Sequence, residues 1–129
     1  MGATNILSGK VVATGDGKLQ LETDSGLRVI ALYDEDTGSN EITGISVHPE
    51  LIELLPLDAG LEGDNRFRGR TIEMIYQGDF IETKISLSQT GELLTAHFPS
   101  RLEMVTRLSP GEEVLVHWSP KSSNTLLDQ

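Results

Sequence analysis

The sequence has no cysteine, few aromatic residues and few basic side chains, and each shortage excludes a class of protein. Without cysteine the chain can form neither a disulfide nor a thiolate metal site, which suits a reducing compartment and favours a cytoplasmic location. Aromatic residues make up 5% of the chain, so the core must rest on isoleucine, leucine and valine. Twenty acidic against ten basic side chains give a net charge of -10, which repels phosphate backbones, so we expect no nucleic-acid partner.

Sequence motifs for membrane insertion and for catalysis are also missing. No apolar run is long enough to cross a bilayer, so we expect a soluble chain with no membrane insertion. There is no phosphate-binding loop, dinucleotide fingerprint or nucleophile elbow. His48, His97 and His117 lie far apart, and none has a second ligand at metal-binding spacing. The sequence therefore predicts no enzyme, no cofactor and no metal, although scattered carboxylates acting with His97 or His117 leave a small enzyme as an alternative.

What the chain does contain is a series of short β-branched and aliphatic runs, bounded by glycine, aspartate, asparagine and proline. This pattern is typical of an antiparallel β protein. We expect four strands at 10–14, 18–23, 27–32 and 41–48, with 51–55 pairing as a short fifth, then strands at 70–76, 80–87, 92–98 and 113–118. Residues 15–17 predict a tight hairpin turn, and the apolar spacing in 100–108 predicts one short helical turn.

The two halves resemble each other. The pattern Asn-x-x-x-Gly-basic begins at Asn5 and again at Asn65, each time directly before a strand. Near the ends, 46–50 corresponds to 115–119, which places His48 and His117 at matching positions. The alternative is a chance coincidence of common turn and strand residues, but the matches occur in the same order in both halves.

These matches predict an all-β fold of two tandem OB-like small β-barrel units packed together, with one short helix in the second unit. We assign 1–55 to the first unit, 56–64 to a linker and 65–129 to the second unit. A unit of this size buries little apolar surface alone, so the two should abut. Functional surface is expected where the halves differ, at 33–40, in the linker and at 98–108.

Five residues are candidates for contact with a partner or ligand. His48 and His117 end strands, Glu50 is an acidic loop residue, and Arg70 is an isolated basic residue at the start of the second unit. Trp118 could anchor a partner or cap the core, and core capping is favoured.

Several segments together resemble the transport-associated OB region at the C-terminus of ATP-binding subunits of ABC importers, of the polyamine, iron and sulfate-type group. The segments that carry the resemblance are 2–10, 45–50, 65–69, 75–78 and 108–118. His48 departs from the family pattern, which commonly has arginine there. The Walker, signature and switch motifs of the transporter ATPase are absent, so the chain resembles the accessory part only.

The resemblance implies a regulatory, non-catalytic domain that contacts the ATP-binding domain of the same transporter and stabilises a homodimer. It would then be cytoplasmic and peripheral to the inner membrane through the transporter complex. A second alternative is a free-standing module that binds a small solute, either an oxyanion such as molybdate or a polyamine. The acidic charge opposes an oxyanion, because oxyanions need converging amides or cations.

Overall fold

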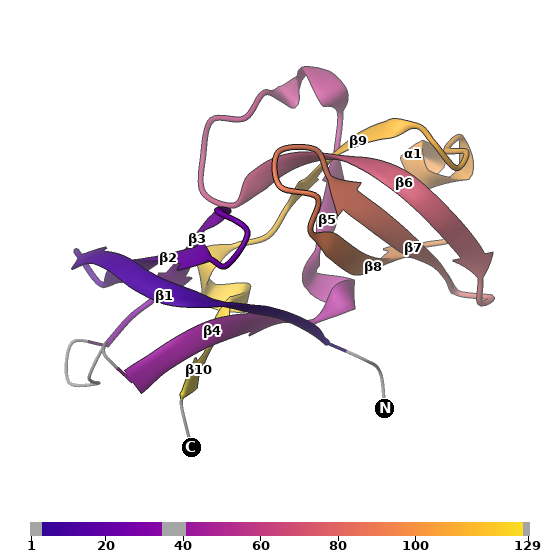
Figure 1. Cartoon of the computed structure of the whole chain (residues 1–129). Coiled ribbons are helices and arrows are strands. Elements are labelled where there is room, and N and C mark those ends of the chain that lie inside the picture. Colours follow the sequence, from indigo (N-terminus) through magenta and orange to yellow (C-terminus); the bar gives the residue numbers. More distant parts are fainter. Residues whose placement is uncertain (1–3, 35–40, 128–129) are drawn as a thin grey trace.

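Two curled antiparallel sheets lie beside each other in the computed structural model, which describes residues 4–34 and 41–127 (Figure 1). The first sheet contains β1 (Asn5–Gly15), β2 (Lys18–Thr23), β3 (Arg28–Leu32), β4 (Ile42–Val47) and β10 (Asn124–Leu127). The second contains β5 (Glu53–Leu55), β6 (Arg66–Tyr76), β7 (Phe80–Leu87), β8 (Leu93–Pro99) and β9 (Glu113–His117). Short helical turns are η2 (Pro49–Leu51), η3 (Leu57–Ala59), α1 (Glu103–Thr106) and η4 (Pro120–Ser122). The predicted fold of two tandem OB-like units, with a short α-helix in the second, is confirmed.

The predicted hairpin between β1 and β2 is present and follows from its turn residues. Asp16 and Gly17 both have positive φ, 54° and 75°. This conformation is the one that a tight turn needs if its twist is to match that of the flanking strands. The strands pair from Gly15 opposite Lys18 back to Gly9 opposite Thr23.

The repeat is visible in the strand pairing. The first long strand of each sheet pairs on one side with its hairpin partner and on the other with a later strand, β4 for β1 and β9 for β6. Each also carries an irregularity at the same place, between Val11 and Ala13 in β1 and between Thr71 and Glu73 in β6. A bulge lets a strand bend, and the bend allows one strand to serve two parts of a curled sheet.

The fifth strand of each sheet comes from the other half of the sequence. We expected 51–55 to complete the first unit, and this prediction is wrong, because β5 pairs with β9 in the second sheet. In return β10, at the end of the chain, pairs with β4 in the first sheet. Figure 1 shows this exchange: the last strand lies beside β4, while β5 lies among the strands of the other sheet. The proposed unit boundaries at 55 and 65 stay a prediction about folding units.

The structure also corrects the matching of His48 with His117. Each of the proline-led turns η2 and η4 follows the fourth long strand of its half, so His48, just before Pro49, corresponds to Ser119, just before Pro120. His117 lies opposite Glu53 and Arg66 in the sheet and corresponds to Ser46. The sequence match was displaced by two residues because both segments carry Val-His.

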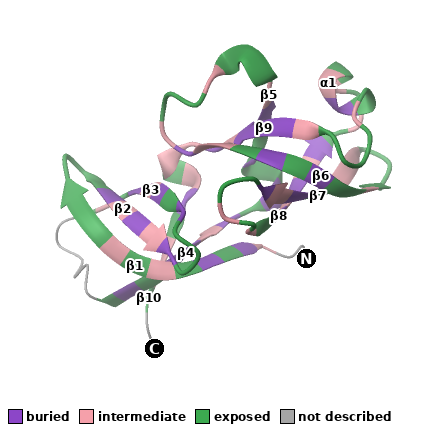
Figure 2. Ribbon diagram, turned by 45° about the horizontal axis from the view of Figure 1, so that its top comes forward, coloured by how far each residue is buried: buried purple, intermediate pink, exposed green. Residues whose placement is uncertain are grey.

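The core is one continuous cluster to which both sheets contribute. Buried and exposed positions alternate along the strands, as the banding in Figure 2 shows. The largest buried side chains include Trp118, Phe98, Leu19 and Leu21. The two units therefore share apolar surface that neither would bury alone.

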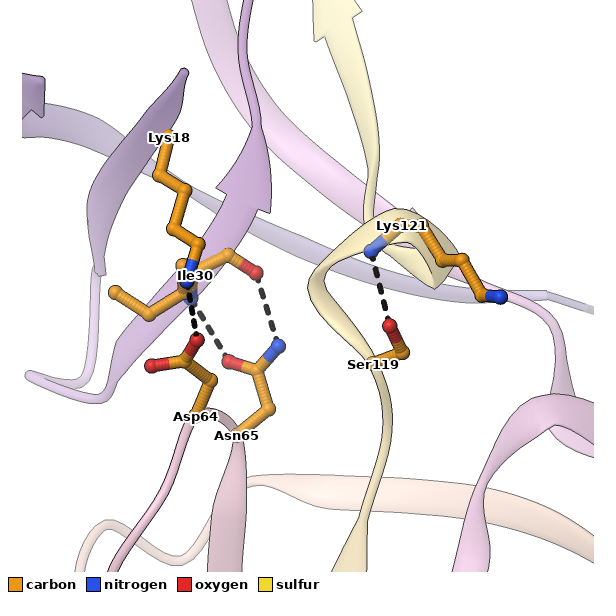
Figure 3. A network of polar contacts seen from close by, with 6 residues as sticks. All are labelled: Lys18, Ile30, Asp64, Asn65, Ser119 and Lys121. Atoms are coloured by element: carbon orange, nitrogen blue, oxygen red, sulfur yellow. Dashed lines mark hydrogen bonds and ion pairs between the residues drawn. The ribbon is translucent and has the colours of Figure 1, made fainter. Parts of the chain in front are cut away.

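Two asparagines connect the halves in the same way. Asn65 accepts a hydrogen bond from the Ile30 amide (2.8 Å) and donates one to the Ile30 carbonyl (2.9 Å), so it pairs with the edge strand β3 as a backbone residue would (Figure 3). Asn5 makes the same pair of bonds to Thr95 in the edge strand β8, at 2.7 and 2.9 Å. The Asn-x-x-x-Gly pattern found in the sequence thus marks a reciprocal clasp between the two sheets.

Candidate functional site

The five residues named from the sequence do not form one site. His48 and Glu50 are exposed beside η2, whereas Arg70 lies on β6, where its guanidinium donates to the Gly111 carbonyl at 2.6 Å. His117 lies at the other end of the β6–β9 ladder, with its Nδ1 3.3 Å from a carboxylate oxygen of Glu53. No side-chain hydrogen bond or ion pair between the described residues joins any two of the five. Their role in binding stays a prediction.

Trp118 is a core residue. Its side chain is fully buried, its ring centroid lies 5.2 Å from that of Phe67, and its indole N–H donates to the Ser123 hydroxyl at 2.8 Å. This bond satisfies the one polar atom of the indole, so burying the ring leaves no hydrogen-bond donor unpaired. In the described fold Trp118 therefore caps the core and has no surface to offer a partner.

Glu50 is the one of the five that lines a hollow. This hollow has a volume of about 310 Å³, and its wall also includes Asp79, Phe80, His97 and Pro99. The imidazole of His97 stacks on the Phe80 ring with centroids 4.4 Å apart, and its Nε2 lies 3.3 Å from a carboxylate oxygen of Glu82. Stacking on Phe80 and the contact with Glu82 together fix the His97 ring. These contacts give His97 a structural role in the wall of the hollow.

An apolar groove, which we call the β5–α1 groove, lies on the surface of the second half. It has a volume of about 330 Å³ and lies between β5 with the following linker, helix α1 and the start of β9. Its apolar lining consists of Leu54, Leu55, Leu57, Met104, Leu108 and Val114. Leu57 is 45% exposed, so the lining is open to a partner.

Local sequence explains how the walls of this groove are fixed. Val105 is buried and anchors the single turn of α1, which places Met104 and Leu108 beside the groove. The backbone carbonyl of Glu112 accepts hydrogen bonds from the amide (2.9 Å) and the hydroxyl (3.3 Å) of the buried Thr71. Buried residues therefore fix the positions of both α1 and the segment that leads into β9.

The rim of the β5–α1 groove is acidic. Glu103, Glu112 and Glu113 line it, with Arg107 as its only base. Glu103 pairs with Arg107, and Glu113 pairs with Arg68 at 3.2 Å. Glu112 is exposed, and among the residues that the structure describes it has no ion-pair partner. The groove thus combines an apolar floor with excess negative charge.

Sequence reasoning named no residue of this groove as a candidate contact with a partner or ligand. It did indicate the segments that form much of its wall, because the linker and 98–108 are where the halves differ. In the third such segment, 33–40, residues 35–40 lie outside the described residues. The signal was the loss of repeat symmetry rather than any motif.

A second cleft, between the two halves, is lined by two arginines. It has a volume of about 250 Å³ and is lined by Leu27, Leu61, Arg66, Phe67, Arg68 and Ser88, among others. Both guanidinium groups are engaged, because Arg66 donates to the Ala59 carbonyl at 3.3 Å and Arg68 pairs with Glu113. An anion here would have to compete with these partners.

Residues 4–34 and 41–127 contain no group of three or more histidine, aspartate or glutamate side chains that could hold a metal ion. No helix in these ranges is both long and apolar enough to span a bilayer.

The described residues thus form a tandem OB-like module with an apolar groove on its surface. The family model of the TOBE domain matches residues 45–124. The chain belongs to the TOBE domain family, which confirms the resemblance seen in the sequence.

Curated relatives and a solved structure extend this result. The chain is 29% identical over 130 residues to the spermidine/putrescine import ATP-binding protein PotA of Trichodesmium erythraeum (strain IMS101), an alignment that covers 95% of this chain and 32% of that protein. It is 30% identical to the PotA protein of Trichormus variabilis over 67% of this chain and 23% of that protein. The chain therefore spans a third or less of the length of these relatives.

A solved structure shares the fold across the whole chain. It is that of the cytoplasmic molybdate-binding protein ModG with molybdate bound, with a TM-score of 0.80, 14% identity and coverage of 96% of each chain. At this identity the likeness shows the fold alone.

Proposed function

We propose that the chain is the accessory, non-catalytic domain of an ABC importer ATP-binding subunit, acting in dimer stabilisation and in regulation of solute import. The observation that carries the proposal is the alignment of 95% of this chain with about a third of an importer ATP-binding protein. The surface agrees with a contact role, because it offers an open apolar groove. In such a role the domain would be cytoplasmic, beside the ATP-binding domain of the same transporter.

Two measurements test this proposal. Sedimentation velocity of the isolated chain should show a dimer that dissociates on dilution. ATPase assays of the parent polypeptide, with and without this chain, should show that its removal weakens dimerisation and abolishes the response to solute. A parent that dimerises and responds equally well without the chain would refute the proposal.

A free-standing binding module is the second candidate, and the fold shared with ModG favours it. Isothermal titration calorimetry with molybdate, sulfate and spermidine distinguishes the two. A saturable signal with molybdate that the Arg66→Ala substitution removes would locate an oxyanion in the cleft between the halves. The net charge of -10 and the engagement of both arginines support the expectation of no heat with either oxyanion.

A further inference from the structure

We propose that the β5–α1 groove is the docking site for a short amphipathic helix of a partner protein that carries apolar side chains on one face and lysine or arginine beside them. This inference names the partner chemistry for the contact role proposed above and rests on it.

The floor of the groove requires an apolar occupant. Leu57 is 45% exposed and Pro56 is also exposed, while Met104 and Leu108 are partly buried beside them. A concave, mostly apolar hollow of about 330 Å³ with a few polar groups at its edge has the form of a binding site. Methionine adds adaptability, because its unbranched side chain adjusts to differently shaped apolar groups.

The rim determines the charge of that occupant. Three glutamates face one arginine around the groove, and Glu112 has no ion-pair partner among the described residues. An anionic lipid surface would bring phosphates to this rim, and a second copy of this acidic chain, which carries a net charge of -10, would form the proposed dimer through another surface. The rim would repel the lipid phosphates, whereas a basic partner would be attracted at long range, and one of its cations would pair with Glu112, since Glu103 and Glu113 already pair with Arg107 and Arg68.

The shape of the groove favours a helix as the element that carries these groups. One wall is a single helical turn, the other is a short strand leading into the linker, and the volume of about 330 Å³ accommodates a few side chains. Helices that bind in grooves present their anchors at i, i+3, i+4 and i+7, which form a narrow apolar stripe along one face. Lysines or arginines flanking the stripe would then lie over the acidic rim.

The test uses the full chain and two synthetic peptides. Both carry leucines at i, i+3, i+4 and i+7, and the remaining positions are mainly lysine in one and mainly glutamate in the other. We expect the lysine peptide to bind, as measured by fluorescence anisotropy, and to shift the amide NMR signals of 54–57, 103–108 and 112–114. The glutamate peptide should bind at least roughly tenfold more weakly.

Matched substitutions and a small cation separate the groove from the acidic surface at large. Glu112→Lys and Met104→Asp should each weaken binding of the lysine peptide roughly tenfold, whereas Asp24→Lys, an exposed carboxylate of the first half, should leave it within about twofold. Shifts spread over the whole chain, equal loss in all three variants, or equally tight binding of octamethylenediamine at the groove would each overturn the proposal. The ATPase assay of the parent would still judge the regulatory role, because regulation can act through other surfaces.

Discussion

Lys18 and Asn65 lie close together in Figure 3, yet they contribute very differently to stability. Lys18 and Asp64 form an ion pair at 3.0 Å, with side chains that are 49% and 39% exposed. Asn65 is 4% exposed and satisfies both backbone groups of Ile30. Water screens the first interaction and can replace it, but it cannot reach the second.

The asparagine clasp should therefore be costly to remove. Asn65→Gly keeps the positive φ of 54° accessible but leaves the amide and carbonyl of Ile30 without their partner. We expect the free energy of unfolding, from urea titration, to fall by about 1–3 kcal/mol. Asn65→Ala should cost more, because it adds backbone strain at the same position. Gln77→Ala, at an exposed turn, is the control and should change little.

The neighbouring ion pair should be nearly dispensable. Lys18→Met removes the contact with Asp64 and retains much of the side chain. We expect a loss of less than about 1 kcal/mol in the same urea titration, and a smaller difference from the unsubstituted chain at high salt. A loss as large as that of Asn65→Gly would contradict this ranking.

At the scale of elements, the glycine in each Asn-x-x-x-Gly motif allows two strands to pass closely. A Cβ on Gly9 would lie 2.7 Å from the Cα of Thr23 and closer still to the carbonyl oxygen of Glu22. On Gly69 it would lie 2.5 Å from a methyl group of Ile85. In the first half the nearest obstacles are all backbone, whereas in the second the nearest is a methyl group of the buried Ile85, and the Ser86 carbonyl oxygen lies further off at 3.0 Å.

Gly9→Ala should accordingly be more harmful than Gly69→Ala. The first must displace paired backbone in the β1–β2 ladder, and we expect it to lower the unfolding free energy by at least about 2 kcal/mol or to prevent folding. Gly15→Ala meets nothing within 4 Å and serves as the control. Thermal unfolding followed by circular dichroism measures all three, and equal melting temperatures for Gly9→Ala and Gly15→Ala would contradict the argument.

Elements were predictable from the sequence where the determining signal is local. The Gly15–Gly17 turn, the alternation in 18–23 and the helical turn within 100–108 depend on residues close in sequence, and each is present. The pairing partners of 51–55 were not predictable. A short run such as Glu53–Leu55 suits an edge in either sheet, and the choice depends on where the chain leads after η2.

The candidate site was predictable only as a region. Leu57, Met104 and Glu112 carry no motif, and they meet because β5 crosses into the second sheet and brings the linker against α1. Trp118 was identified individually, but its role was not predictable. A tryptophan at the end of a strand suits either a core or an interface, and the hydrogen bond to Ser123 shows that it belongs to the core.

At the scale of the whole molecule, the exchange of β5 and β10 makes each half dependent on the other. A fragment of 1–64 would lack β10, leave β4 with an unpaired edge, and expose β5 without β9. It would also lose the second sheet's share of the common core. We therefore expect the intact chain to unfold in a single cooperative step and the 1–64 fragment to be unfolded in solution.

Adding β10 back to the first half tests whether the 1–64 fragment is unfolded because it lacks this strand or only because it is short. A chain in which 1–47 is joined by a flexible linker to 120–127 contains every strand of the first sheet but is shorter than the 1–64 fragment. Because β10 would again pair with β4, with Asn124 opposite Ser46, amide NMR should show greater dispersion and slower hydrogen exchange in this chain than in 1–64. If both chains are equally unstructured, the exchanged strand is not what couples the halves, and the shared core must account for their dependence. If 1–64 folds alone, the halves do not depend on each other and the argument is refuted.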